Sequence, residues 1–409
     1  MLAAASALLA AAPGTGARAA SDAQTPAAAA LPDREPFWGP HQGGIVTPQQ
    51  AHTYFAAFDL HAKKPGEVVQ LLRTWTDAAA RMAAGTTAAP LGDDPNVPAG
   101  DSFEASDLPP ARLTITFGFG PGLFSKDGAD RYGLAARRPE ALVDLPRFNG
   151  DQLIPARSGG DIAVQACADD PQVAFHAVRQ LARLAYGAAE LRWVQTGFLS
   201  RSPRTPEVTP RNLMGFKDGT QTPSDLDKFV WADGPDWMAG GSYMVARRIR
   251  IALEHWDRTP LDFQEEVFGR HKRSGAPLGK QNEFDAVDLD ATDSEGNPVI
   301  AENAHVRLAT AASNDGAQIL RRGYSYNDGV NFTAERWPPW RQGMEYDAGL
   351  FFVGYQRDPR TAFIKVFEKM AKFDMLNQYA THTGGGLFAC PAGVREGEFI
   401  GECLFRAPA

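Results

Sequence analysis

The sequence predicts an α+β fold in which two similar halves each form a plait, an antiparallel sheet with helices packed on one face. The segments 170–178 (DPQVAFHAV) and 358–366 (DPRTAFIKV) share the pattern D-P-x-x-A-F-x-x-V and start 188 residues apart. At almost the same spacing, the strand-like segments 53–60 and 242–253 are each followed by a helical segment. The matching order and spacing of these strand–helix units indicate a duplication.

The first half shows the alternation typical of strands and the three-to-four-residue spacing of apolar positions typical of helices. The expected strands are 53–60, 112–120, 161–168 and 191–200, and the expected helices are 66–82 and the segment that begins with 170–178. Pro171 falls near the first turn of the second helix, where proline is tolerated because that N–H has no intrahelical partner.

The second half repeats this order. The expected strands include 242–253 and 349–356, and helices are expected at 260–270 and from 358–366, with Pro359 near the first turn. The polar stretch 277–303 carries the turn signal Glu-Gly-Asn-Pro at 295–298 and is expected to be a loop.

The composition is that of a folded globular protein. The chain has 409 residues, 44% of them hydrophobic, which is long enough for one large core or two smaller ones. The net charge of −8 argues against nucleic acid as a partner, because such binders need basic stripes that displace counterions. Three cysteines, at 167, 390 and 403, are too few and too scattered for a disulfide framework or a structural zinc, so all three are expected to be small buried hydrophobes.

The N-terminus has the features of an export signal. An apolar run of eleven residues, LAAASALLAAA, precedes the small-residue cleavage pattern Ala17-Arg18-Ala19, although no basic residue comes before Arg18. We therefore expect a signal peptide over 1–19, a flexible lead-in over 20–48, and a mature protein in the periplasm or outside the cell. No other apolar stretch reaches the roughly 18 residues of a membrane helix, so no stable membrane insertion is expected.

One acid stands out in the stretch 211–223, RNLMGFKDGTQTP, where Asp218 lies between Gly215 and Gly219. The stretch can be a plain turn, a phosphate-binding loop, or a rigid support that directs a carboxylate into a buried site. A Walker loop needs G-x-x-x-x-G-K-[ST], and here Lys217 precedes its glycine, so the phosphate loop is disfavoured.

His305 stands sixteen residues before Arg321. No second histidine or carboxylate follows it at the second to fourth position, which leaves a zinc site without local support. A single axial imidazole on a haem needs no such partner, because the porphyrin itself supplies four nitrogens.

Five motifs in order, GFKDGT, HVRLA, ILRRGYSY, GLFFVGYQRDP and GGGLFACP, resemble the dye-decolorizing peroxidase family of haem proteins. The chain is most similar to the exported deferrochelatase/peroxidase branch, over residues from about 50 to 405. The resemblance implies two ferredoxin-like halves in a dimeric α/β-barrel-like arrangement, over 49–210 and 211–409, with one haem b in the second half.

The resemblance also implies roles for single residues. His305 becomes the proximal haem ligand, Asp218 the distal acid–base and Arg321 its distal partner. A carboxylate within reach of both peroxide oxygens can move a proton from the inner to the outer one, and a guanidinium stabilises the departing hydroxide and keeps the carboxylate ionised. Asp374 is the candidate carboxylate on the proximal imidazole.

Further family positions are expected around the haem. Gly219, Thr220, Gln221 and Thr310 are expected to contact it, and Leu350 and Phe352 to form a wall of the distal pocket, although a core strand predicts the same alternation. The related branch carries an Asn-Pro-Arg after the proximal histidine where this chain has ATAASN, so Arg307 or Arg322 is expected to replace it at the propionates. For Arg322, which follows Arg321, a structural role is the alternative.

The expected function is that of an exported haem b peroxidase that uses H2O2 to oxidise organic donors such as dyes or phenols through a ferryl intermediate. The branch resemblance adds iron release from exogenous haem with the porphyrin intact. A homodimer is one of the oligomeric states that the sequence leaves open. The alternative is a non-catalytic haem carrier, which needs His305 but has no use for Asp218 and Arg321 as a pair.

Overall fold

The structure is a computed structural model that describes residues 33–200, 208–219, 222–234, 237–334 and 342–406. Residues 33–409 form one compact unit, and the expected signal peptide and much of the lead-in lie outside the described residues. Among the described residues, no helix combines the length and the apolar character that crossing a bilayer requires.

The first half follows the predicted order. Its elements are β1 (His52–Leu60), α1 (Pro65–Ala83), β2 (Thr114–Phe119), α2 (Pro121–Phe124), β3 (Ile162–Ala168), α3 (Pro171–Leu184) and β4 (Ala189–Phe198), with short 3-10 turns at Ala135–Arg137 and Pro155–Arg157. The strands pair antiparallel in the spatial order β4-β1-β3-β2. This is the order of a ferredoxin-like plait.

The second half has the same strand order. It contains α4 (Leu226–Phe229), β5 (Ser242–Ile251), α5 (Leu253–Trp256), α6 (Leu261–Phe268), α7 (His305–Ala309), β6 (Leu320–Arg321), β7 (Tyr324–Ala334), β8 (Gln342–Gln356), α8 (Phe363–Phe373), β9 (Ala380–Cys390) and α9 (Glu402–Phe405), with 3-10 turns at Ala312–Asn314 and Met375–Gln378. The spatial order β9-β5-β8-β7 reproduces that of the first half, and β6 precedes β7 along the same edge of β8. The predicted duplication of a ferredoxin-like plait is confirmed.

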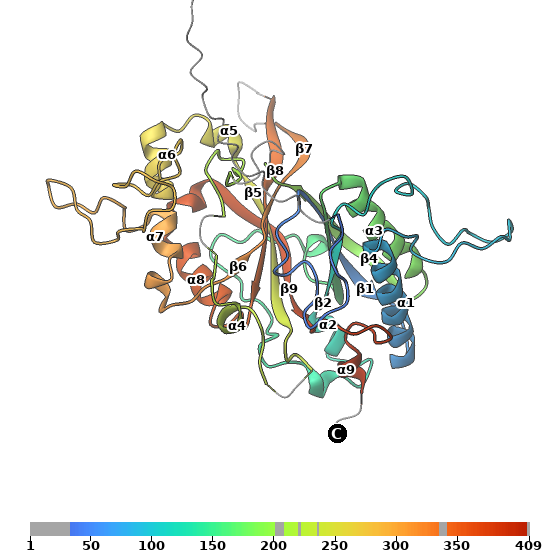
Figure 1. Ribbon diagram of the computed structural model, residues 1–409. Coiled ribbons are helices and arrows are strands. Elements are labelled where there is room, and N and C mark those ends of the chain that lie inside the picture. The colour runs from blue at the N-terminus through green and yellow to red at the C-terminus, as the bar shows by residue number, and fades with distance from the viewer. Residues whose placement is uncertain (1–32, 201–207, 220–221, 235–236, 335–341, 407–409) are drawn as a thin grey trace, which may run out of the picture. The chain divides into compact units, whose positions relative to one another are not determined.

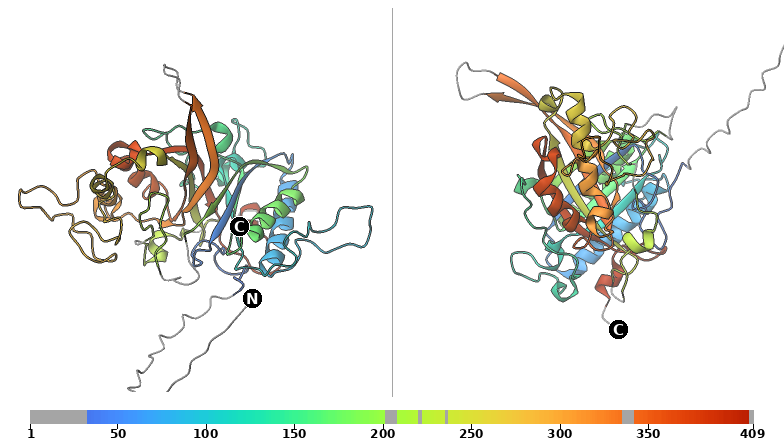
Figure 2. Two further views of the ribbon diagram at one scale, coloured as in Figure 1. Left: turned by 90° about the horizontal axis from the view of Figure 1, so that it is seen from above. Right: turned by 90° about the vertical axis from the view of Figure 1, so that its left-hand side faces the viewer.

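The two sheets join at both edges and close into a barrel. The joins are short: β2 meets β9 at the pair Phe119 and Ala389, and β4 meets β7 at the pair Phe198 and Ser325. The helices lie outside the ring of strands, with α1 and α3 against the first half and α6, α7 and α8 against the second (Figures 1 and 2). Both faces of the strands are therefore covered.

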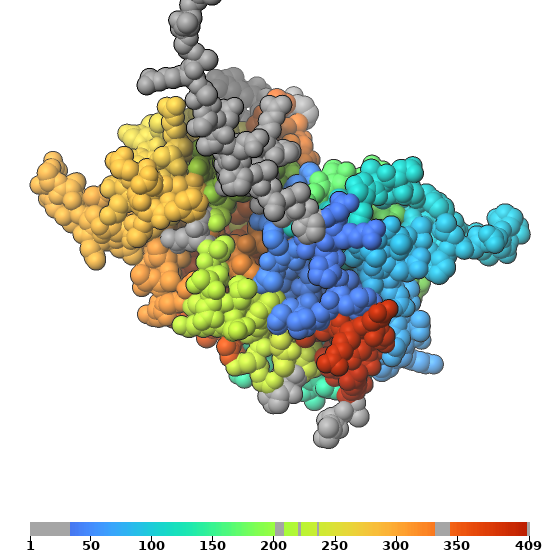
Figure 3. All heavy atoms as spheres, in the orientation of Figure 1, coloured from blue at the N-terminus to red at the C-terminus, as the bar shows by residue number. Residues whose placement is uncertain are grey.

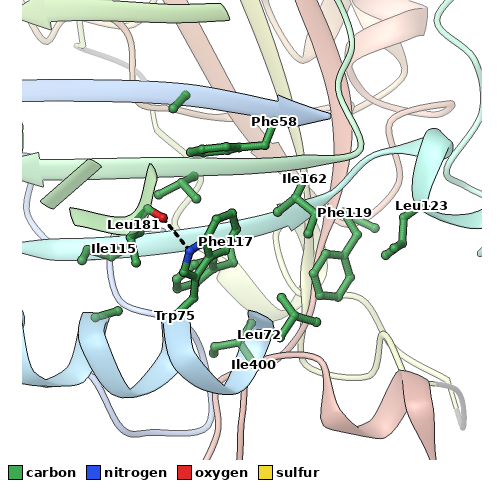
Figure 4. Packing of buried hydrophobic residues seen from close by; sticks show 14 of the residues in the cluster. Phe58, Leu72, Trp75, Ile115, Phe117, Phe119, Leu123, Ile162, Leu181 and Ile400 are labelled. Carbon is green, nitrogen blue, oxygen red and sulfur yellow. Dashed lines mark hydrogen bonds between the residues drawn. The ribbon is translucent and has the colours of Figure 1, made fainter. Parts of the chain in front are cut away.

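Because both faces of the strands are covered, successive side chains of one strand point alternately into two cores. On β1, Phe55 and Ala57 belong to a buried cluster inside the barrel, whereas Ala56 and Phe58 belong to the cluster beneath α1 and α3. Trp75 on α1 is fully buried in the outer cluster, and its indole N–H donates to the carbonyl of Leu181 over 2.8 Å (Figure 4). Truncating a buried residue of this size costs roughly 3–5 kcal/mol.

Two local predictions are wrong. In the first repeat, Asp170 caps α3 by accepting the N–H groups of Gln172 and Val173, and Pro171 is the first helical residue, as predicted. In the second repeat, Asp358 accepts the backbone N–H of Arg360 and also pairs with its guanidinium, but α8 begins only at Phe363, so Pro359 precedes its first turn. The other error concerns the cysteines, which are all free thiols. Two are buried, but the third, in α9, is exposed.

Candidate active site

A cavity of about 590 Å³ lies in the second half, between the outer face of the sheet and helices α7 and α8. Ile249 and Ile251 on β5, with Leu350 and Phe352 on β8, line the sheet side. Residues of α8 line the opposite side: Phe363, Val366, Phe367 and Met370. The volume and the apolar walls are those of a site for a small-molecule ligand or cofactor.

The turn that carries Asp218 is fixed by its own hydrogen bonds. The side-chain oxygen of Asn212 accepts the N–H groups of Met214 and Phe216, and the N–H of Asn212 donates to the carbonyl of Phe216. Gly215 has φ +87° and Gly219 has φ +115°, values at which an L side chain is strained. The two glycines therefore shape the backbone on either side of the acid.

The same turn is anchored to the cluster beneath it. Phe216 stacks on Phe268 of α6, with ring centroids 3.9 Å apart, and the indole N–H of Trp256 donates to the carbonyl of Met214 over 3.0 Å. In the surface view, the yellow-green segment around residues 210–235 lies between the blue N-terminal part and the yellow-orange part of the second half (Figure 3). Asp218 thus stands on a rigid support at the cavity wall.

Arg321 lies on β6 and contacts Asp218 across the cavity wall. It is the last residue of β6, opposite Gly354 of β8, and its Nη1 donates to Oδ1 of Asp218 over 3.0 Å. Both residues line the cavity.

The neighbouring Arg322 points away from the cavity. Its side chain is buried, and its guanidinium donates to the carbonyl of Thr47 and the side-chain oxygen of Gln50. Successive side chains of an extended segment alternate between faces, which separates the two arginines into a cavity residue and a residue of the interior.

His305, the first residue of α7, faces the cavity from the helix side. Its Nδ1 lies 2.7 Å from Oδ2 of Asp374, a buried carboxylate whose other oxygen accepts the N–H of Leu376. Because an ionised carboxylate only accepts, Nδ1 carries the hydrogen and Nε2 keeps its lone pair for a metal. The predicted contact between Asp374 and the imidazole is present.

The electrostatics link the two walls of the cavity. Burial by itself lowers the pKa of His305, but the charge and hydrogen bond of Asp374 outweigh it and raise the pKa above its ordinary value. Smaller contributions come from Arg321, which lowers this pKa, and Asp218, which raises it. The pKa of His305 therefore depends on charged groups from both walls of the same cavity.

The other predicted contacts divide into three groups. Gly219, Leu350 and Phe352 line the cavity, and their contact with haem stays a prediction. Thr310 is not among the lining residues: it is buried, and its hydroxyl donates to the carbonyl of Arg307, so its contact with haem stays a prediction. Thr220 and Gln221 lie outside the described residues.

The two arginines expected at the propionates do not line the cavity. Arg307 donates to the backbone carbonyls of Leu289 and Ile300, and Arg322 is held in the interior as described above. Both guanidinium groups donate to neighbouring oxygens of the protein; for Arg322 this favours the structural alternative, and the anchoring of the propionates stays a prediction.

Comparison with known proteins places the chain in a family. Residues 42–199 match the Dyp-type peroxidase N-terminal family, and residues 209–395 match the Dyp-type peroxidase C-terminal family. The chain belongs to the Dyp-type peroxidase family. Members of this family are haem peroxidases, which agrees with the enzyme class that the sequence predicts.

Individual relatives cover most of this Dyp-type peroxidase. It is 41% identical to a dye-decolorizing peroxidase of Thermobifida fusca (strain YX), over 89% of this chain and 83% of the relative. It is 38% identical to a deferrochelatase of Escherichia coli (strain K12), over 91% of this chain and 88% of the relative.

Solved structures also match this chain over most of its length. An oxyferrous complex of DtpA from Streptomyces lividans matches with a TM-score of 0.82 and 42% identity, over 91% of this chain and 98% of the other. A DyP-type peroxidase from Streptomyces coelicolor matches with a TM-score of 0.81 and 42% identity, over 91% and 97% of the two chains.

The cavity of this Dyp-type peroxidase also contains His382 on β9, which the sequence did not single out. Nε of Arg247 donates to Nδ1 of His382 over 3.0 Å, and the buried Arg247 is paired in turn with Asp151. Burial and then the charge of Arg247 hold the pKa of His382 well below its ordinary value, so the ring is neutral and Nε2 carries its hydrogen.

Arg270 is a second polar lining residue that the sequence did not identify. It donates to the carbonyls of Gly275 and Glu283 and is close enough to Arg321 for their charges to repel. Nothing in its sequence neighbourhood, RHKR, distinguishes it from a solvated basic face.

Proposed function

We propose that this protein is an exported haem b peroxidase that reduces H2O2 and oxidises organic donors such as dyes or phenols. The observation that carries the proposal is the meeting of three groups in one apolar cavity: an imidazole with a fixed tautomer, and an acid paired with a guanidinium. Haem, when bound, supplies the iron that holds peroxide and takes up its oxidising equivalents.

His305 is proposed as the iron ligand. Its Nδ1 is hydrogen-bonded to Asp374, so Nε2 is the nitrogen available for coordination. A carboxylate on the far nitrogen fixes the ring orientation and makes the imidazole a stronger donor. His382 has the opposite arrangement, with Nδ1 accepting from Arg247, so its Nε2–H is available to an acceptor such as a propionate oxygen.

Asp218 is proposed as the acid–base. The carboxylate accepts the proton from the inner oxygen of peroxide and returns it to the outer oxygen, which leaves as water. Arg321, 3.0 Å from that carboxylate, places a permanent positive charge where negative charge develops on the leaving oxygen. A non-catalytic haem carrier has no use for this pair.

A second activity, the release of iron from exogenous haem with the porphyrin left intact, is supported by the 38% identity to proteins named deferrochelatase. Incubation with hemin and a chelator of Fe(III) tests it. The expected products are chelated iron and fluorescent protoporphyrin in equal amounts; an open-chain tetrapyrrole or no iron release contradicts it.

The main proposal is tested on the purified holoprotein by its absorption spectrum before and after one equivalent of H2O2. We expect a Soret band that changes within the mixing time and returns when a phenolic donor is added. The Asp218→Asn variant should keep the resting spectrum and lose the rapid change, whereas Asp233→Asn, which alters an acid paired with Arg357 outside the cavity, should behave as wild type. Peroxide turnover that is equal in Asp218→Asn and wild type contradicts the assignment.

A further inference from the structure

A second cluster of ligand-type side chains lies in the first half, on residues that do not line the haem cavity. Asp101 and Glu104 come from the long connection between α1 and β2, and His176 comes from α3. One ligand atom from each residue lies within 4.8 Å of the other two. The connection is the cyan segment that runs outward beside α1 and α3 (Figure 1).

The connection is held against α3 by residues other than the candidate ligands. The guanidinium of Arg183 donates to the backbone carbonyls of Ala99 and Gly100, and the side-chain amide of Gln180 contacts the hydroxyl of Ser102. These contacts keep the two acids opposite His176, which lies one helical turn before Gln180 on the same face of α3.

Two buried atoms in this cluster have no hydrogen-bond partner. They are Nδ1 of His176 and Oε1 of Glu104, and the His176 side chain is only 9% exposed. The atoms are 3.1 Å apart, but the ring nitrogen is not directed along the line that joins them, as a hydrogen bond requires. Unpaired buried polar atoms cost free energy, so they call for a partner.

A metal ion satisfies this geometry better than a proton does. Two ligands each about 2.1 Å from an ion and 3.1 Å from each other subtend an angle of about 95° at the ion. The lone pair of the nitrogen then points to one side of the oxygen, which agrees with the lack of a direct hydrogen bond between these two atoms.

Asp101 supplies the third ligand atom. Its Oδ1 accepts the N–H of Phe103 and its Oδ2 accepts the N–H of Ala88, and one carboxylate oxygen of Asp101 lies within 4.8 Å of the ligand atoms of His176 and Glu104. A carboxylate oxygen has two lone pairs, so Oδ2 keeps one for an ion. Asp101 is 4% exposed, and an ion here is shielded from bulk water on that side.

The two carboxylate oxygens of Glu104 have different partners. Its Oε2 contacts the Ser102 hydroxyl and, at 3.1 Å, the half-exposed guanidinium of Arg179, which leaves Oε1 for the ion. Two carboxylates and the guanidinium of Arg179 give the cluster a net charge of −1. The cluster therefore attracts a cation, and the attraction is weaker than it would be without Arg179.

We propose that Asp101, Glu104 and His176 bind one divalent transition-metal ion of the Zn²⁺ type, with water completing the coordination. One imidazole and two carboxylates form a ligand set that Zn²⁺ accepts. The ion joins the connection between α1 and β2 to α3, so its role is to stabilise the first half and to keep this long loop in place.

The test uses the haem-loaded, full-length protein after treatment with a chelator, and ZnCl2 as the probe in isothermal titration calorimetry. We expect one Zn²⁺ per chain and a rise in the midpoint of thermal unfolding with Zn²⁺ concentration. The His176→Gln variant should bind Zn²⁺ at least about tenfold more weakly, while its Soret band is unchanged. His271→Gln, which removes a histidine paired with Glu265, is the matched control and should bind Zn²⁺ as wild type does.

Arg179→Gln separates an ion site from a purely internal ion cluster and also covers the case in which His176→Gln fails to fold. Removing this positive charge should tighten Zn²⁺ binding, because the guanidinium repels the ion. A protonated His176 bridging the two carboxylates predicts instead no Zn²⁺ uptake and no tightening in Arg179→Gln. Either of these results, or equal Zn²⁺ affinity in wild type and His176→Gln, overturns the proposal.

Discussion

The carboxylate of Asp374 lies 2.7 Å from Nδ1 of His305, although the two residues are 69 positions apart in the chain. The acid is the cap of the 3-10 turn Met375–Gln378 and accepts the N–H of Leu376, so its orientation is set by local backbone geometry. The imidazole is therefore aligned by a group that is itself fixed, which is the arrangement that a histidine ligand to a metal requires.

Replacing Asp374 by Asn should weaken the donor strength of His305. We expect hemin to leave the protein about 10–100-fold faster, measured by transfer to an excess of an apo-globin acceptor. The Fe(III)/Fe(II) reduction potential should rise, because a less basic axial ligand stabilises the ferric state less. Asp358→Asn, at an acid paired with Arg360 before α8, is the control and should leave both values unchanged. An unchanged potential in Asp374→Asn contradicts the role of the contact.

Asp218→Asn should preserve hemin binding and slow the reaction with peroxide by about 10²–10⁴-fold, the usual contribution of a positioned acid–base. The measurement is the second-order rate of the Soret change in stopped flow. The amide keeps the size of the side chain and a hydrogen bond with Arg321 but does not accept a proton, so a rate within a few-fold of wild type excludes Asp218 as the base.

The adjacent arginines should respond in opposite ways. Arg321→Leu removes a charge at the cavity and should slow the peroxide reaction by about 10²–10³-fold, with little change in stability. Arg322→Leu leaves the carbonyl of Thr47 and the side-chain oxygen of Gln50 without their donor, and should lower the free energy of unfolding by roughly 1–3 kcal/mol per group. Chemical denaturation and stopped flow on both variants check the contrast; equal effects on stability argue against it.

The pH dependence of haem binding follows from His305. Its pKa in the haem-free protein is raised by Asp374, and a proton on Nε2 competes with iron. Hemin affinity should therefore fall as the pH decreases, starting above the ordinary imidazole pKa, and Asp374→Asn should move this fall to lower pH. The haem-free protein should show the opposite trend. A raised folded pKa stabilises it at pH values below the unfolded pKa, and this stabilisation is lost as the pH rises through the folded pKa. Hemin titrations and denaturation across pH 5–9 test both trends.

The sequence predicted those features that depend on local patterns. The repeated D-P-x-x-A-F-x-x-V segments indicated the order of the two plaits, and the glycines around Asp218 indicated a shaped turn, in which both glycines have positive φ. The roles of His305 and Arg321 rested on a resemblance that extends over nearly the whole chain.

Features that depend on distant contacts were not predicted. His382 obtains its tautomer from Arg247, 135 positions earlier, and Arg247 is paired with Asp151, a further 96 positions earlier. No local pattern reveals such a chain of contacts. The start of α8 was also misplaced: Asp358 accepts the backbone N–H of Arg360 as a cap does, yet the helix begins only at Phe363.

The barrel closes through one residue pair at each join, Phe119 with Ala389 and Phe198 with Ser325. If either half were produced alone, four outer strands that now adjoin the other half would become open edges, two on each fragment. Open edges offer unpaired N–H and C=O groups to any neighbouring chain, and such surfaces lead to aggregation or strand exchange. The tandem arrangement thus protects each copy from self-association, and separating the copies at the 199–209 linker should yield fragments that precipitate unless they are produced together.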